Sequence, residues 1–272
     1  MIHKILILTL EPYLAYLFFV LIGWVIERKV NSVEVNRLNP IRLNLECGLL
    51  YELTAAITLT VAPAFTTVGV NAAGGGWIVL PSSGWTLFPA FLLYAFTMDF
   101  FEYLFHRAQH RIPILWSMHS LHHSDAAINA STTNRHYWAE FAIKSMTIYM
   151  MGGIIFKVSS TIIGFYVVLG FYNFFPHMNL RVGLGRWWMV LNSPQYHRIH
   201  HSSLREHWNC NFSGLFPIFD VIFGTFHIPK QGEYPPTGLD TGEHPSGLIE
   251  AAFWPVRSLW RGAKVIDGLK VE

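Results

Sequence analysis

The sequence predicts an all-α fold: a polytopic bundle of membrane helices that carries a helical, histidine-rich cap on its cytoplasmic side. Hydrophobic residues make up 52% of the 272 residues and charged residues only 13%, against about 25% charged in a typical soluble domain. Several apolar stretches approach the roughly 20 residues that cross a hydrocarbon core. The 14 histidines gather mainly in polar segments next to these stretches. The alternative, a soluble protein with very apolar core helices, is disfavoured by the lengths of the stretches.

Three membrane segments are predicted in the N-terminal part of the chain. The first apolar stretch covers residues 5–26 and lacks the small-residue cleavage site of a signal peptide, so we expect it to be an anchor. The second covers residues 47–70 and is weaker because it contains Glu52. Residues 71–84 are glycine-rich and uncharged, which is typical of a turn. The third apolar stretch covers residues 85–105.

Two shorter apolar stretches, within residues 141–175, predict a helical hairpin that enters the membrane. Basic residues within 27–46 favour a cytoplasmic position for that loop, and the histidine-rich region then lies on the same side. We therefore expect four or five membrane segments. The chain divides into N-terminal spans and loops (1–98), a histidine-rich domain that includes the hairpin (99–227) and a water-facing C-terminal tail (228–272).

Eight histidines form three groups at helical spacing. Residues three and four apart lie on one face of a helix, so each group directs two or three imidazoles the same way. Pro113 and the pair Ser193-Pro194 are typical helix starts and precede the second and third groups. Chance clustering of surface histidines is a poor alternative because the pattern occurs three times. The groups are His106 and His110; His119, His122 and His123; and His197, His200 and His201.

These eight imidazoles are enough for two metal sites, and imidazole suits Fe, Zn, Cu and Ni. An adjacent pair, such as His122-His123, can send one ring to each of two neighbouring metals, so the repeated pattern predicts a dinuclear site. His136 and His177 are further candidate ligands because each lies near the end of an apolar segment. We assign structural roles to the isolated His3, His227 and His244 and leave His207 open.

Five polar side chains are candidates for orienting the ligand rings through hydrogen bonds. For each of them a helix cap, a surface charge or a loop hydrogen bond is an equally good interpretation. They are Asp99, Glu102, Asp125, Glu140 and Asn179.

These motifs, in this order, resemble those of the fatty acid hydroxylase and sterol desaturase superfamily. Residues 99–113 are similar to its first histidine box, residues 115–125 to its second, and residues 193–202 to its third. Residues 129–136, which end in His136, are similar to the segment that follows the second box, although Tyr137 stands where the family usually has proline, and His177 resembles the family's isolated histidine. Residues 211–226 are similar to its closing motif.

The resemblance implies a membrane enzyme with two iron ions and no haem. It implies oxidation of a lipid C–H bond with O₂, with hydroxylation as the first expectation and desaturation as the second. The chain contains no P-loop, G-x-G-x-x-G or C-x-x-C-H motif, so we expect no bound nucleotide, flavin or haem. Electrons would come from a separate donor, a ferredoxin-like or b-type-cytochrome-like protein with its reductase.

Two other classes of function remain open from the sequence: a membrane zinc-dependent hydrolase and a non-catalytic metal-binding membrane protein. The hydrolase lacks support because no H-E-x-x-H motif is present. A transport protein would place ionisable groups within its spans. A nucleic-acid partner is disfavoured because the net charge is only +2.

Overall fold

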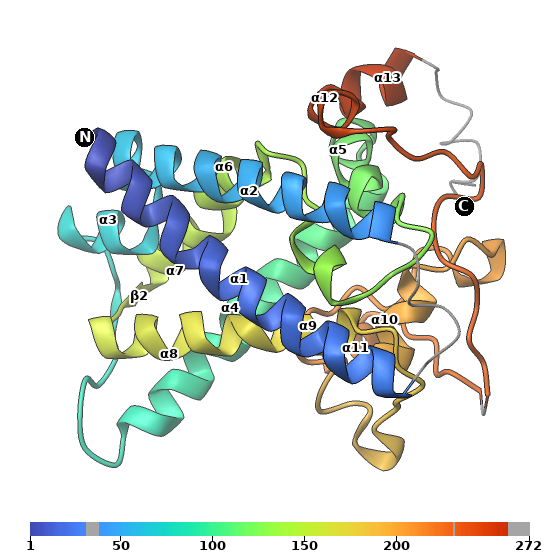
Figure 1. The fold of residues 1–272 in the computed structure, drawn as a ribbon. Coiled ribbons are helices and arrows are strands. Elements are labelled where there is room, and N and C mark those ends of the chain that lie inside the picture. The colour runs from blue at the N-terminus through green and yellow to red at the C-terminus, as the bar shows by residue number, and fades with distance from the viewer. Residues whose placement is uncertain (31–37, 231, 261–272) are drawn as a thin grey trace.

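The structure is a computed structural model that describes residues 1–30, 38–230 and 232–260 (Figure 1). Helices dominate the described residues, as the sequence predicts. The α-helices are α1 (Ile2–Val30), α2 (Leu38–Val61), α3 (Thr67–Ala72), α4 (Leu87–Arg111), α5 (Pro113–His123), α6 (Glu140–Lys144), α7 (Met150–Ile155), α8 (Ser160–Gly170), α9 (Phe174–His177), α10 (Pro194–His200), α11 (Ile218–Ile222), α12 (Leu248–Ala252) and α13 (Trp254–Trp260). Two short strands, β1 (Ile78–Val79) and β2 (Phe156–Lys157), pair in parallel.

Among the described residues, α1 and α4 are the two helices that are long and apolar enough to cross a membrane. Large apolar side chains of α1 face outward: Leu14 is 61% exposed and Phe18 58% exposed. Such a continuous apolar surface is unusual on a protein surrounded by water. The other side of α1 packs against α2 and, through Tyr16 and Val20, against Phe174 of α9. The remaining expected membrane segments stay predictions.

The second apolar stretch differs from its predicted limits. Helix α2 begins at Leu38, inside the segment expected to be a charged loop, and ends at Val61. It ends there because Pro63 follows, and a proline disfavours helical geometry in the residue before it. Ala62 accordingly leaves the helical region, with φ −132° and ψ 43°. The chain then turns into the short helix α3 and not into a continued span.

The predicted hairpin is present as two helical arms joined through β2. The first arm runs without a break from α6 to α7, with a wider π-helical turn at Ser145–Tyr149 between them. The second arm contains α8 and α9. Both arms pack against α4, where Tyr94 and Met98 meet Ile148 and Ile162 in one apolar core. The pairing of β1 with β2 was missed, because strands of two residues leave no periodic signal.

Helix α4 links the apolar part of the molecule to the histidine-rich part. It runs across the predicted division between residues 98 and 99 without interruption, and its last two turns carry His106 and His110. Helix α5 follows after a single residue, Ile112. The histidines of the first box are therefore held on the same rigid element as the apolar span.

The C-terminal helices α12 and α13 pack against α5 and α2. Trp254 is 2% exposed and its indole Nε1 donates to Ser120 Oγ of α5 at 2.9 Å. Ile249 and Phe253, by contrast, are 80% and 66% exposed. The tail expected to face water thus docks one face on α5 (Figure 1). It leaves an apolar face outside. Residues 261–272 of that tail, and Arg37 of the basic loop, lie outside the described residues.

Candidate metal centre

The three histidine groups lie on helices, as their spacing predicts. His106 and His110 occupy the end of α4, and the second group occupies the last two turns of α5. Helix α10 carries the third group, with His201 as its C-terminal cap. Its start is the predicted one: Ser193 caps the helix by accepting a hydrogen bond from Tyr196 N, and Pro194 follows.

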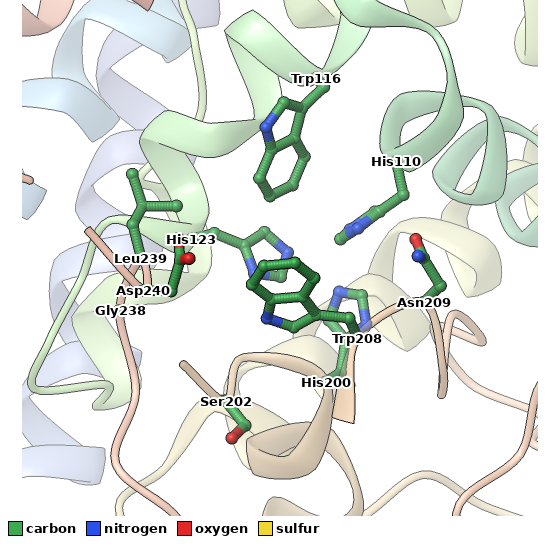
Figure 2. Close-up of a pocket in the computed structure, with 10 residues that line it drawn as sticks. All are labelled: His110, Trp116, His123, His200, Ser202, Trp208, Asn209, Gly238, Leu239 and Asp240. Atoms are coloured by element: carbon green, nitrogen blue, oxygen red, sulfur yellow. The ribbon is translucent and has the colours of Figure 1, made fainter. Parts of the chain in front are cut away.

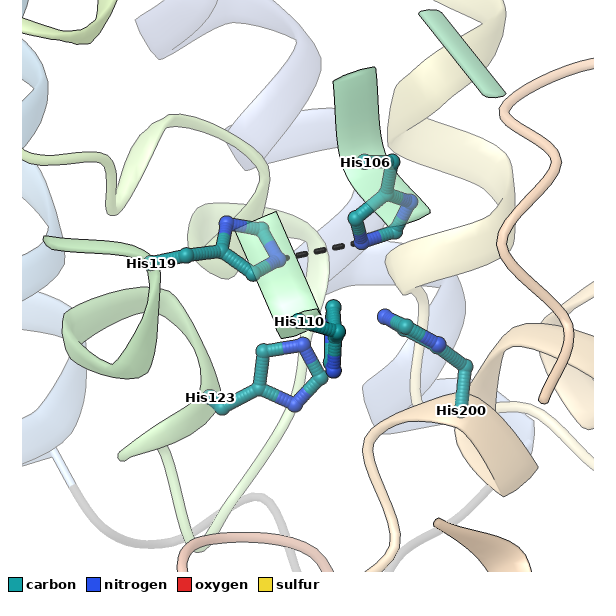
Figure 3. A group of neighbouring side chains, drawn as sticks. All are labelled: His106, His110, His119, His123 and His200. Atoms are coloured by element: carbon teal, nitrogen blue, oxygen red, sulfur yellow. Dashed lines mark hydrogen bonds between the residues drawn. The ribbon is translucent and has the colours of Figure 1, made fainter. Parts of the chain in front are cut away.

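Five histidines form the first cluster, and one nitrogen of each lies within 4.8 Å of the others (Figure 3). His106 Nε2 and His119 Nε2 are 3.0 Å apart. The Nε2 atoms of three members are buried and find no hydrogen-bond partner among the described residues, and the same is true of Nδ1 of His119. The first cluster consists of His106, His110, His119, His123 and His200, and those three members are His110, His123 and His200.

Four histidines form the second cluster, again with one nitrogen of each within 4.8 Å of the others. His177 Nε2 lies 3.0 Å from His197 Nε2 and 3.3 Å from His122 Nε2. His197 Nε2 lies 3.2 Å from His201 Nε2. All four side chains are buried. The second cluster is therefore His122, His177, His197 and His201.

The two clusters lie next to each other, and each pair of sequence-adjacent histidines contributes one residue to each cluster. His122 belongs to the second cluster and His123 to the first, while His200 belongs to the first and His201 to the second. The rings of His123 and His201 stack across the boundary, with centroids 4.4 Å apart. Each pair thus sends one ring to each cluster, which is the arrangement that the H-x-x-H-H pattern predicts.

Three ring tautomers are fixed by backbone carbonyls. His106 Nδ1 donates to Phe212 O at 2.6 Å, His200 Nδ1 to Cys210 O at 2.8 Å and His177 Nδ1 to Asn173 O at 2.7 Å. A carbonyl oxygen only accepts, so each Nδ1 carries the hydrogen and each Nε2 presents a lone pair to its cluster. Such bonds are the usual way in which a protein orients metal-bound imidazoles. No sequence signal marks them, because every residue has a carbonyl.

Burial keeps these imidazoles neutral. It lowers the pKa of His200 to about 4 and lowers the pKa values of His123 and His201 below the ordinary histidine value, with neighbouring histidines adding to the effect for the latter two. A neutral imidazole has the free lone pair that a metal needs. The buried Nε2 atoms of His110, His123 and His200 have no hydrogen-bond partner among the described residues, and a cation in the first cluster would give them one. The residues present therefore fit a pair of metal ions, one in each cluster.

His136 lies beside the second cluster and forms a separate group with His119 and Glu140. Its ring stacks on His122 with centroids 4.6 Å apart. Its Nδ1 is 3.2 Å from Glu140 Oε2, and Glu140 also contacts Lys144 at 3.6 Å. Glu140 is thus placed to orient the ring of His136, a candidate ligand.

The structure gives other partners to the remaining four polar candidates. Asp99 accepts hydrogen bonds from the backbone nitrogens of Leu215 and Phe216. Asp125 accepts from Asn44, Thr132 and the backbone of Ala127. Glu102 pairs with Lys144 at 3.0 Å, and Asn179 Oδ1 accepts from Arg198. These contacts hold the segments around the clusters in place.

A cleft opens directly onto the first cluster (Figure 2). Its empty volume is about 630 Å³, including its open mouth. His110, His123 and His200 form one part of its lining. The side chains of Trp116, Trp208 and Leu239 make much of the rest apolar, and Ser202 and Asp240 add polar groups. An apolar chain can therefore approach the first cluster from this cleft.

The comparisons with known proteins agree with this geometry. Residues 91–225 match the family model described as fatty acid hydroxylase. The chain is 33% identical over 181 residues to human alkylglycerol monooxygenase, a match that covers 65% of this chain and 38% of that protein. It is 31% identical over 165 residues to the Caenorhabditis elegans alkylglycerol monooxygenase, covering 61% of this chain and 32% of that protein.

A bacterial relative shows the same similarity. The ornithine lipid hydroxylase of Rhizobium tropici is 27% identical over 176 residues, covering 63% of this chain and 51% of that protein. The chain thus spans about a third of the length of the alkylglycerol monooxygenases that it matches. No solved structure matches the chain. The matched segment contains all ten candidate ligands, and residues 91–225 belong to the fatty acid hydroxylase family.

Proposed function

We propose that this protein hydroxylates a C–H bond of a membrane lipid with O₂ at a centre of two iron ions. The observation that carries the proposal is the pair of adjoining histidine clusters, in which nine neutral imidazoles converge. The matches to lipid monooxygenases and hydroxylases support the lipid as substrate. Bound iron would supply the activation of O₂ and the oxidising power that cleaves an unactivated C–H bond.

The first cluster would hold one ion and the second cluster the other. His136 would join the centre beside His122, with Glu140 fixing its ring. Backbone carbonyls of Phe212, Cys210 and Asn173 would keep three ligand rings in the metal-binding tautomer. An all-imidazole set adds no negative charge, so the ions would stay strongly electron-withdrawing.

The cleft beside the first cluster would bind the part of the lipid that reacts. Trp116 and Trp208 offer broad apolar faces to an alkyl or acyl chain and displace water from it. Ser202 and Asp240 would meet more polar atoms of the same lipid. In hydroxylation one oxygen atom of O₂ enters the substrate and the other leaves as water. The reaction therefore consumes two electrons and two protons, which a separate ferredoxin-like or b-type-cytochrome-like donor would deliver.

The test is turnover with defined components. Purified protein loaded with iron is given a lipid extract, a ferredoxin or cytochrome with its reductase, and ¹⁸O₂. We expect a lipid product that carries one ¹⁸O atom, and about two irons per chain by elemental analysis. His201→Ala should abolish the product while the protein still resists alkaline extraction from membranes. His244→Ala, a change at an exposed histidine outside both clusters, should leave the product unchanged.

Other outcomes would point elsewhere. A product that has lost two hydrogens and gained no ¹⁸O would identify desaturation. Stoichiometric zinc together with hydrolysis of a lipid ester would replace the proposal with a hydrolase. Iron binding without any lipid oxidation, in the presence of a working electron donor, would indicate a non-catalytic metal-binding protein.

A further inference from the structure

A third group of potential ligands lies apart from both histidine clusters. It consists of His207, His227 and Glu233, with one ligand atom of each within 4.8 Å of the others. His207 Nε2 is 3.1 Å from Glu233 Oε1, and His227 Nε2 is 3.6 Å from Glu233 Oε2. The two imidazole rings meet edge to face with centroids 4.8 Å apart. His227 Nε2 is buried and makes no hydrogen bond to any described residue.

The spacing of these atoms is close to that of a tetrahedral zinc site. Zinc bonds of about 2.0–2.1 Å to nitrogen and oxygen place the ligand atoms roughly 3.3–3.4 Å apart in a tetrahedron. The observed separations lie on either side of that value: 3.1 Å from His207 Nε2 to Oε1 of Glu233 and 3.6 Å from His227 Nε2 to Oε2 of the same carboxylate. The proposed ligand nitrogens of the main centre show similar separations, for example 3.0 Å between His106 and His119 and 3.2 Å between His197 and His201.

Other contacts hold each of the three residues where a metal would need it. His207 Nδ1 lies 2.9 Å from Ser202 Oγ, which fixes the ring and leaves Nε2 directed at Glu233. The backbone of His227 is bound on both sides by the side chain of Asn211, at 2.7 and 3.0 Å. Glu233 Oε2 accepts a hydrogen bond from Lys230 N at 2.7 Å. The three residues are therefore positioned before any metal arrives.

We propose that His207, His227 and Glu233 bind a single zinc ion at a site separate from the main centre. Two imidazoles and one carboxylate suit zinc, which binds such ligand sets more tightly than ferrous iron does. His227 and Glu233 are partly exposed, at 27% and 19%, so solvent can supply the fourth ligand. The proposal is independent of the proposed oxidation, because it concerns other residues.

The site would fasten the segment that forms the outer wall of the cleft. Three residues after Glu233, Pro236 O accepts a hydrogen bond from Ser203 N. The next residue, Thr237, pairs with Ser202 in an isolated antiparallel β-bridge. Gly238 N then donates to His201 O, and Gly238 lines the cleft. A zinc ion at Glu233 would therefore tie the start of this wall to the segment that follows α10.

The experiment counts metals in the full-length protein. Protein whose main centre has been loaded with iron is equilibrated with zinc, desalted and measured by elemental analysis. We expect one zinc per chain in the wild type and none in Glu233→Gln or His227→Ala, with the iron content unchanged in all three. Glu233→Gln keeps the shape of the side chain and can still accept from Lys230 N, so it should fold. His244→Ala is the matched control and should keep both metals.

Thermal unfolding provides a second readout. Zinc at about a hundredfold its Kd should raise the Tm of the wild type by roughly 5–10 °C and leave that of Glu233→Gln unchanged. The proposal is overturned if the wild type holds no zinc beyond the main centre, or if both variants keep their zinc. Loss of zinc and iron together would also overturn it, because the zinc would then belong to the main centre.

Discussion

Two asparagines hold the segment that orients the ligand rings. Asn209 and Asn211 both have φ of 59°, a left-handed conformation that is uncommon outside glycine and most tolerated by asparagine and aspartate. The carbonyl of Cys210 between them accepts from His200, and that of Phe212 accepts from His106. The alternation of backbone conformation is what turns both carbonyls toward the first cluster.

We expect Asn211→Ala to weaken metal binding by about 10–100-fold, because the carbonyls that orient His200 and His106 would shift. Alanine at this φ is strained by about 1–2 kcal/mol. The substitution also removes the hydrogen bonds that Asn211 donates to Tyr196 O and His227 O and the one that it accepts from His227 N. Competition with a chelator measures the affinity. Asn209→Gly is the control, since glycine adopts the same φ freely. An Asn211→Ala protein with wild-type affinity would show that the carbonyls do not depend on this side chain.

The sequence identifies the candidate ligands but not the groups that surround them. Eight of the ten candidate histidines were found because imidazoles at helical spacing are rare by chance, and His136 and His177 were found because each lies near the end of an apolar segment. The carbonyls of Cys210, Phe212 and Asn173 carry no side-chain signal and could not be found. His227 looked isolated because its partners, His207 and Glu233, meet it only through the fold of the 202–233 segment.

At the scale of elements, α7 approaches α3 unusually closely. A Cβ at Gly153 would lie 2.8 Å from Val70 Cβ and 2.9 Å from Thr67 Cα, and Thr67 Oγ1 donates to Tyr149 O in the preceding turn. Only a residue without a side chain allows this approach. The contact fixes the first arm of the hairpin, which also carries Glu140 toward His136.

We expect Gly153→Ala to lower the free energy of unfolding by about 1–3 kcal/mol through overpacking. Gly164→Ala in α8 is the matched control: its Cβ would meet nothing within 4 Å, so it should be neutral or stabilise the helix by up to about 1 kcal/mol. Thermal unfolding in detergent compares the two variants. Equal stabilities would mean that the α3–α7 contact relaxes without strain.

The sequence predicted the helices that are long or that begin with a recognisable capping residue. It did not predict the elements that form only through tertiary contacts. Pro113 and Ser193-Pro194 begin α5 and α10 as expected, because their effect is local. The start of α2 at Leu38 was missed because polar residues at its beginning looked like a loop. The β1–β2 pair exists only because the turn after α3 meets the hairpin.

For the whole molecule, the arrangement of charges predicts an orientation in the membrane. The uncharged segment around Ser82 and the clusters would lie on opposite sides, with the clusters in the cytoplasm. We expect a cysteine at Ser82 to react with an impermeant thiol reagent from outside intact cells. A cysteine at Ser246 should react only after the cells are opened.

Both positions are exposed, and the native Cys47 and Cys210 are buried, which keeps the background low. Labelling of Ser246→Cys in intact cells, with Ser82→Cys protected, would show that the orientation is the opposite of the one predicted. Labelling of both from outside would mean that the segments between them do not separate two compartments.

Glu27 connects the beginning of the chain to parts that are synthesised much later. Its carboxylate, on the last turns of α1, accepts hydrogen bonds from Ala130 N at 2.9 Å and from Asn179 N at 2.8 Å. These partners follow it by 103 and 152 residues. A ribosome therefore completes α1 long before either backbone nitrogen exists. During that time the Glu27 carboxylate has neither of these two hydrogen-bond donors. Helix α1 therefore completes its contacts with these later segments only after the chain has been made past residue 179, so its docking is a late step in the assembly of the protein.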